Sequence, residues 1–158
     1  MKKSEIRAMI REMIQEAKID KYKFAEEIND EYDELMDNEG KLWGDSVKGL
    51  SAMLKLKAKY EKYIKMELDD GTARKQLVFY EVNIKEMDSY IIDFEDINPI
   101  LKKLKKGKTP EEVRKIMKSS KYWDWKDDGF DDKIMKLNGP MDLYIKFNKA
   151  GKLERWNF

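Results

Sequence analysis

Residues 62–84, KYIKMELDDGTARKQLVFYEVNI, mark the point at which the pattern of the sequence changes. Two runs with extended character, 63–68 and 76–84, flank the turn-forming sequence DDG. Two such runs around a glycine-containing turn are typical of a β-hairpin. A third run, SYIIDFED at 89–96, has the same character. We therefore predict that an antiparallel sheet begins in this part of the chain.

The residues before this stretch predict helices. From Ser4 onward, apolar residues recur at the i, i+3, i+4, i+7 and i+8 spacing of an amphipathic helix, and Ser4 suits its N-cap. The apolar positions of this first helix are Ile6, Met9, Ile10, Met13 and Ile14. A second helical pattern begins near Asp20 and ends at the sequence DNEG. A third runs from about residue 45 to residue 59, although Gly49 weakens it.

The residues after this stretch predict short helices and a hairpin. NPILKKLKKG, 98–107, favours a short helix that ends at its glycine, and TPEEVRKIM, 109–117, begins with the capping pattern of Thr109 and Glu112. DLYIKFNKAGKLERW, 142–156, alternates apolar and polar residues around a turn, as a hairpin does.

These elements predict one α+β domain over residues 1–158, with a helical part at 1–59 and a sheet-containing part at 60–158. An N-terminal helical layer is expected to pack on a mostly antiparallel sheet with short helices and a C-terminal hairpin.

The composition excludes several classes of chemistry. Charged residues make up 41% of the 158 residues, yet the formal net charge is only +1, which argues against a globally basic nucleic-acid binder. The chain has no cysteine and no histidine, so disulfides, thiolate nucleophiles, sulfur-bound zinc and imidazole bases are all excluded. The sequence contains no complete catalytic motif, and we expect neither enzymatic activity nor a cofactor. We also expect no signal peptide and no membrane span, because charged residues interrupt every apolar run.

The segment KYWDWKDDGFDD, 121–132, surrounds one glycine with five aspartates. An EF-hand alignment that uses this glycine places Lys126 and Met135 where calcium ligands belong, so we predict no metal there. Two tryptophans that are two residues apart share one face of an extended segment, and they fit either the core or a protein interface. We predict a partner-binding segment whose contact residues are Trp123, Asp124, Trp125, Asp127 and Asp128.

Charge is segregated along the chain. Residues 26–45 carry nine acids and one base, whereas residues 47–65 carry six lysines and one acid. Two such helices could pair with each other, or present faces of opposite sign to partners. We predict that Asp30, Asp33 and Asp37 of the acidic helix contact a protein partner.

Two further patterns indicate alternative functions. KKLKKGK contains a basic cluster that could contact phosphates, but it lacks interleaved aromatic residues; its lysines are Lys102, Lys103, Lys105, Lys106 and Lys108. DDGTARKQLVFYEVNIK resembles the magnesium-dependent nucleases that use an aspartate on one strand and Glu-x-Lys on the next, with Asp70 and Glu81 in those places. Asn83 stands where that family has lysine, and Lys85 lies two residues further on.

Two likenesses to known families concern the ends of the chain. KSEIRAMIREMI, within the first seventeen residues, resembles the N-terminal amphipathic segments of small structural or accessory proteins of tailed bacteriophages. This resemblance implies a virion component or an accessory protein that binds a host factor, located in the cytoplasm or in a virion. KGKTPEEVRKIM with LYIKFNKAGKLERW is similar to the helix-then-hairpin order of small outer-membrane-assembly lipoproteins, from which we take only the shape.

Together these patterns predict a non-enzymatic protein-interaction protein. Residues 1–17 could in addition mediate homo-oligomerisation.

Overall fold

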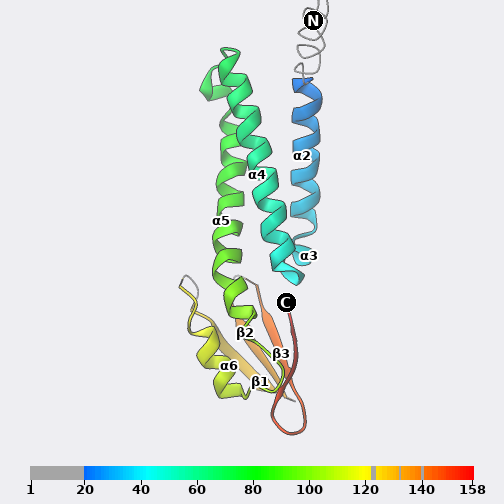
Figure 1. The fold of residues 1–158 in the computed structure, drawn as a ribbon, viewed down its shortest axis with the longest axis vertical. Helices are drawn as coiled ribbons and strands as arrows, with labels where there is room; N and C mark the ends of the chain where they lie inside the picture. The colour runs from blue at the N-terminus through cyan, green and yellow to red at the C-terminus, as the bar shows by residue number, and fades with distance from the viewer. Residues whose placement is uncertain (1–19, 122–123, 132, 140) are drawn as a thin grey trace, which may run out of the picture.

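The computed structural model describes residues 20–121, 124–131, 133–139 and 141–158. Helices α2, α4 and α5 lie along the long axis of an elongated molecule, and a small sheet with α6 forms the end away from the start of α2 (Figure 1). The fold is α+β, as predicted. The helices are α2 (Lys21–Asp37), α3 (Glu39–Gly44), α4 (Ser46–Asp69), η1 (Arg74–Gln76), α5 (Val78–Leu101) and α6 (Pro110–Met117). The strands are β1 (Lys126–Asp131), β2 (Ile134–Asn138), β3 (Leu143–Phe147) and β4 (Leu153–Asn157).

The residues predicted as three strands form two long helices instead. The predictions of strands at 63–68, 76–84 and 89–96 are wrong, because these residues lie mainly in the antiparallel helices α4 and α5. Helix α4 extends beyond its predicted end near residue 59, and α5 continues to Leu101. The predicted turn does occur between them, and Gly71 has a φ of 86° there. Tertiary contacts stabilise the helices: Asn83 donates a hydrogen bond to the Tyr60 hydroxyl (3.3 Å), and Lys57 pairs with Asp88 (2.6 Å).

Other elements follow their sequence signals. The Thr109 side chain accepts from the Glu112 backbone N–H, and the Glu112 carboxylate accepts from the Thr109 N–H, so the predicted capping box is confirmed. The C-terminal hairpin is confirmed as β3 and β4, with Gly151 at a φ of 70° in its turn. Asp20 caps α2. The amphipathic pattern at 4–17 lies outside the described residues.

The sheet is an antiparallel meander in the order β1-β2-β3-β4. Its inner face is buried in the same core as Val113 and Met117 of α6. The inward residues alternate with outward ones along β2 and β3; they are Met135, Leu137, Leu143, Ile145 and Phe147.

The helical part and the sheet share one buried core. Trp43 of α3 packs on Phe94 of α5 (4.8 Å between ring centroids) and on Phe158 at the C-terminus (5.5 Å). Ser46 donates a hydrogen bond to Asn98, whose amide in turn donates to the Ser46 carbonyl (3.2 Å). The hydrogen bonds between Ser46 and Asn98 hold the N-terminal end of α4 against α5, next to the sheet (Figure 1). None of the described helices combines the length and the apolar character that crossing a bilayer requires.

Candidate functional site

The acidic residues of α2 form a stripe along its outer face. Asp30, Asp33 and Asp37 are exposed, and Tyr22 and Glu26 precede them at helical spacing on the same face. Tyr22 is 90% exposed. In the part of the chain that the structure describes, these four carboxylates form no ion pair. We call the five residues the acidic α2 stripe. This stripe is open to solvent, and its contact with a partner stays a prediction.

The opposite face of α2 packs on α4, so the acidic and basic helices do lie against each other. Ile28 and Tyr32 are buried there, and Glu31 forms an ion pair with Lys59. The Tyr32 hydroxyl donates to Glu86 of α5 (2.6 Å), and burial together with this hydrogen bond raises the pKa of Tyr32. These interactions hold the three-helix bundle together.

The tryptophan and aspartate segment is divided between core and surface. Trp125 is only 7% exposed, and its ring lies so close to Gly139 that a Cβ there would be 2.3 Å from it. The prediction that Trp125 contacts a partner is therefore wrong, because its ring packs inside the molecule. Asp124 is exposed, while Trp123 lies outside the described residues.

The aspartates of this segment do not lie in a calcium-binding loop. The backbone of Asp127 and Asp128 is part of β1, which pairs with β2 through a bulge between Asp127 and Gly129. Their side chains lie outside the described part of the structure.

The residues of the nuclease hypothesis lie on helices, not on neighbouring strands. Asp70 caps the end of α4 and pairs with Lys21 (2.5 Å), while Glu81 in α5 pairs with Arg74 (2.8 Å). Hydrogen bonds to Asp70 and Glu67 raise the pKa of Lys21. Lys85 is exposed on α5. The strand-to-strand arrangement on which the resemblance depends is therefore wrong, and both carboxylates have structural partners.

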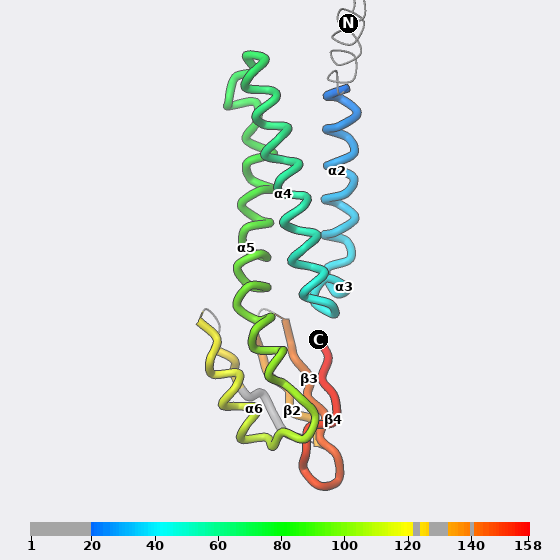
Figure 2. Tube along the Cα trace, in the orientation of Figure 1, coloured from blue at the N-terminus to red at the C-terminus, as the bar shows by residue number. Residues whose placement is uncertain are grey.

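The lysine cluster lies between α5 and α6, alongside the sheet. In Figure 2 the chain leaving α5 runs beside β4, where the Gly107 N–H donates to the Leu153 carbonyl (2.9 Å) and the Leu153 N–H donates to the Lys108 carbonyl (2.7 Å). Lys108 also pairs with Glu112 (3.4 Å). The other lysines of the cluster are exposed; they are Lys102, Lys103, Lys105 and Lys106.

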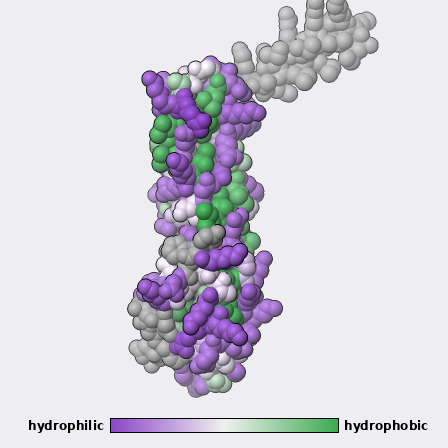
Figure 3. Space-filling model, turned by 90° about the vertical axis from the view of Figure 1, so that its left-hand side faces the viewer, coloured by the Kyte–Doolittle hydropathy of each residue, from purple (hydrophilic) through white to green (hydrophobic). Residues whose placement is uncertain are grey.

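An apolar patch on α5 was missed from the sequence. Val78, Phe79 and Val82 are 50%, 57% and 51% exposed, and Val82 lies one turn after the other two, so that its side chain neighbours both. We call these three residues the α5 patch. Figure 3 views the molecule from its α5 side and shows hydrophobic residues over the helical part, between hydrophilic ones. The patch was missed because residues 76–84 were predicted as a strand, whereas in a helix these three residues gather on one side.

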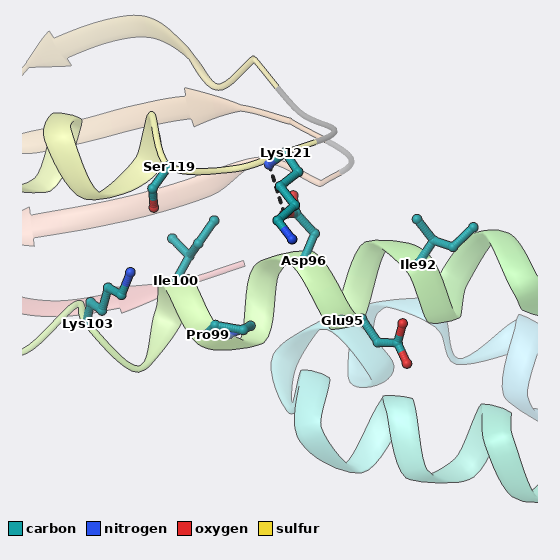
Figure 4. A pocket seen from close by; sticks show the side chains of 8 residues that line it. All are labelled: Ile92, Glu95, Asp96, Pro99, Ile100, Lys103, Ser119 and Lys121. Carbon is teal, nitrogen blue, oxygen red and sulfur yellow. Dashed lines mark hydrogen bonds between the residues drawn. The ribbon is translucent and has the colours of Figure 1, made fainter.

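A hollow of about 380 Å³ lies where α5 meets the segment that follows α6 (Figure 4). Asp96 of α5 accepts hydrogen bonds there from the Ser120 hydroxyl and from the Lys121 backbone N–H (2.9 Å). Pro99 also lines the hollow, and it has no N–H to donate to the Glu95 carbonyl. These hydrogen bonds of Asp96 attach the segment after α6 to α5. We therefore interpret the polar groups of this hollow as structural.

The chain matches no family model, no curated protein and no solved structure.

Proposed function

We propose that this is a non-enzymatic protein-interaction protein that binds a helix of its partner on the α5 patch. The observation that carries the proposal is the exposure of Val78, Phe79 and Val82 side by side on one helix. Contiguous exposed apolar residues with a polar rim are typical of protein-binding surfaces. An amphipathic partner helix could cover all three side chains with its apolar face.

Covering the patch would stabilise a complex appreciably. Full burial of a valine or phenylalanine contributes roughly 2 kcal/mol, so covering three half-exposed side chains contributes about 3 kcal/mol. That suffices for the apolar centre of an interface but not for a whole one. The acidic α2 stripe supplies a second element, since its carboxylates, which form no ion pair with any residue that the structure describes, favour a basic partner and accelerate its association.

The pKa shifts of two carboxylates favour a binding function over a catalytic one. The pKa of Glu67 is lowered by hydrogen bonds from Thr72 and Lys21, and that of Glu112 by the Thr109 backbone N–H. Each of these shifts has a structural partner as its cause. The N-terminal likeness to phage proteins suggests the setting, namely a virion component or an accessory protein that binds a host factor.

The test is a comparison of Val82→Glu with Val47→Glu. Val47 lies in the first turn of α4 and is 58% exposed, so both variants place a carboxylate on an exposed helix position of similar accessibility. Glutamate is at least as good a helix former as valine, so both should fold. Tagged wild type and both variants would be used for affinity capture from the same host lysate, with quantitative identification of bound proteins.

We expect Val82→Glu to reduce recovery of a defined partner at least tenfold, while Val47→Glu retains it. Sedimentation velocity on the three proteins would show whether a second copy of the chain occupies the patch. Equal recovery of every captured protein with wild type and Val82→Glu would refute the proposal.

A further inference from the structure

The outward face of the sheet carries a group of side chains that the core does not need. Ile134, Tyr144, Lys146, Arg155 and Asn157 line a depression of about 230 Å³ on this face. They come from β2, β3 and β4, and they alternate with the inward residues of those strands. Ile134 is 42% exposed and Tyr144 is 38% exposed. This combination of a shallow hollow, cations and an exposed aromatic ring lies on the face opposite the core.

The charges on this face oppose the stability of the sheet itself. Lys146 on β3 lies directly opposite Arg155 on β4. Like charges in directly paired positions destabilise a sheet. In the part of the chain that the structure describes, neither cation has a carboxylate partner, whereas nearby Lys136 pairs with Asp142 (3.1 Å). Residues that break a local rule without an evident structural gain are expected at functional sites, and two cations side by side favour an anionic ligand.

The lysine cluster extends this positive surface past the edge of the sheet. The backbone hydrogen bonds of Gly107 and Lys108 to Leu153 place the cluster along the edge of β4 that faces away from β3. Lys105 and Lys106 are exposed there, and Lys152 is exposed in the adjoining turn. Two basic segments that are some 40 residues apart in the sequence thus meet at one end of the molecule. A chain of phosphates could run from the hollow across β4 to these lysines.

Tyr144 decides which polyanion fits best. Its register partners are Lys136 on β2 and Asn157 on β4, and its ring lines the same hollow as Lys146 and Arg155. An exposed aromatic ring on a basic sheet is a platform on which an unpaired base can stack, while cations beside it neutralise the phosphates. Paired bases in a duplex do not offer their faces in this way. We propose that this face, together with the lysine cluster, binds single-stranded nucleic acid. This site is distinct from the α5 patch and goes beyond the proposed protein interaction.

The test measures binding of fluorescein-labelled oligo(dT) and oligo(U), each of about 20 nucleotides, by fluorescence anisotropy between roughly 50 and 200 mM KCl. We expect Tyr144→Ala to weaken binding about tenfold, as loss of one stacked base would, and Tyr144→Phe to retain affinity. Replacing Lys146 and Arg155 together by glutamine should reduce the salt dependence, by about 0.7 in the log–log slope for each phosphate that the protein no longer neutralises. The two oligonucleotides distinguish DNA from RNA as the ligand.

Matched controls come from the helical part. Tyr22→Ala removes a tyrosine that is 90% exposed on α2, and Lys55→Ala with Lys65→Ala removes two exposed lysines of α4. All three changes should alter the affinity for the oligonucleotides by less than about twofold, a difference that we count as no effect. Circular dichroism melting identifies a variant that fails to fold; if Tyr144→Ala does, the Lys146 and Arg155 pair decides.

Three results would overturn the proposal. The first is absence of binding by both oligonucleotides at the lowest salt. The second is equal weakening by the sheet variants and by the controls, which would indicate charge alone. The third is tighter binding of an acidic polypeptide such as poly-glutamate than of either oligonucleotide, which would assign the face to an acidic protein.

Discussion

Gly49→Ala tests how closely α4 approaches α3 and α5 near its N-terminal end. Gly49 is buried in α4, where a Cβ would lie 2.8 Å from the Leu42 carbonyl oxygen and 3.0 Å from the ring of Phe94. The first of these atoms belongs to the backbone of α3, and Phe94 is 0% exposed, so neither can move away freely.

Two opposing effects determine the result. Alanine is favoured over glycine by about 1 kcal/mol inside a helix. Insertion of an extra methyl group into a close-packed core costs about 1 to 3 kcal/mol, and a contact that requires the backbone to shift belongs in the upper part of that range. We therefore expect Gly49→Ala to lower the free energy of unfolding by about 1 to 2 kcal/mol. For a chain of this length the melting temperature should fall by about 3 to 6 °C.

The assay is urea denaturation followed by circular dichroism, with Gly40→Ala as the control. Gly40 lies in α3, is exposed, and a Cβ there would meet nothing within 4 Å, so this variant should gain about 0.5 kcal/mol. The same substitution is thus expected to have opposite signs at two sites nine residues apart. A Gly49→Ala protein that is as stable as wild type would refute the packing of α4 against α3 and α5 described above.

Further predictions concern the sheet end and the N-terminal segment. Gly139→Ala should destabilise at least as much as Gly49→Ala, because its Cβ would lie 2.3 Å from the Trp125 ring; a neutral effect in the same urea assay would contradict the burial of that tryptophan. Thr109→Ala should cost about 1 kcal/mol through loss of the cap, measured as a shift in the urea midpoint. The Thr109 N–H lowers the pKa of Glu112, so the stability that this carboxylate contributes is present above its unfolded pKa of about 4.3 and is lost as the pH falls through the lower folded value. Glu112→Gln should flatten the fall in melting temperature with acidification, and an unchanged pH profile would contradict this. Removal of residues 1–17 should reduce self-association in sedimentation velocity and leave the melting temperature nearly unchanged, because Asp20 caps α2 without them; a sharply lowered melting temperature with an unchanged oligomeric state would show that the segment is part of the core.

Local signals predicted the elements whose ends are defined by capping and turn chemistry. The box of Thr109 and Glu112 and the turn before Gly151 are both formed by interactions between residues less than five apart in the sequence, so the sequence alone reveals them. The α4 and α5 pair was misassigned because valine, phenylalanine, tyrosine and isoleucine favour strands, and α5 is apolar on more than its buried face. A helical period was nevertheless present in its buried positions, which are Asn83, Met87, Ile91, Phe94 and Ile97.

The candidate surfaces were predictable only where one segment contains all of the residues. The acidic α2 stripe and the lysine cluster each lie within one continuous stretch, and their residues are exposed apart from the half-buried Lys108. Lys146 and Arg155 become neighbours only through strand pairing, and their relation to the lysine cluster depends on the hydrogen bonds of Leu153. Trp125 shows the opposite case, since its spacing from Trp123 fitted a surface or a core, and only packing against Gly139 decided between them.

The α5 patch lies near the start of α5, and the lysine cluster, which belongs to the proposed nucleic-acid site, follows the end of the same helix. Val82 and Lys102 are twenty residues apart, and at 1.5 Å per helical residue they are separated by about 30 Å. A partner helix on the patch would therefore leave the sheet face uncovered, and one molecule could hold a protein and a nucleic acid together. Binding of one ligand should then leave the affinity for the other unchanged, because no shared residue couples the two sites. Val82→Glu is accordingly expected to lose the protein and keep the oligonucleotide, whereas Tyr144→Ala should do the reverse. Loss of both ligands in either variant, with the fold intact, would mean that the two surfaces act as one site.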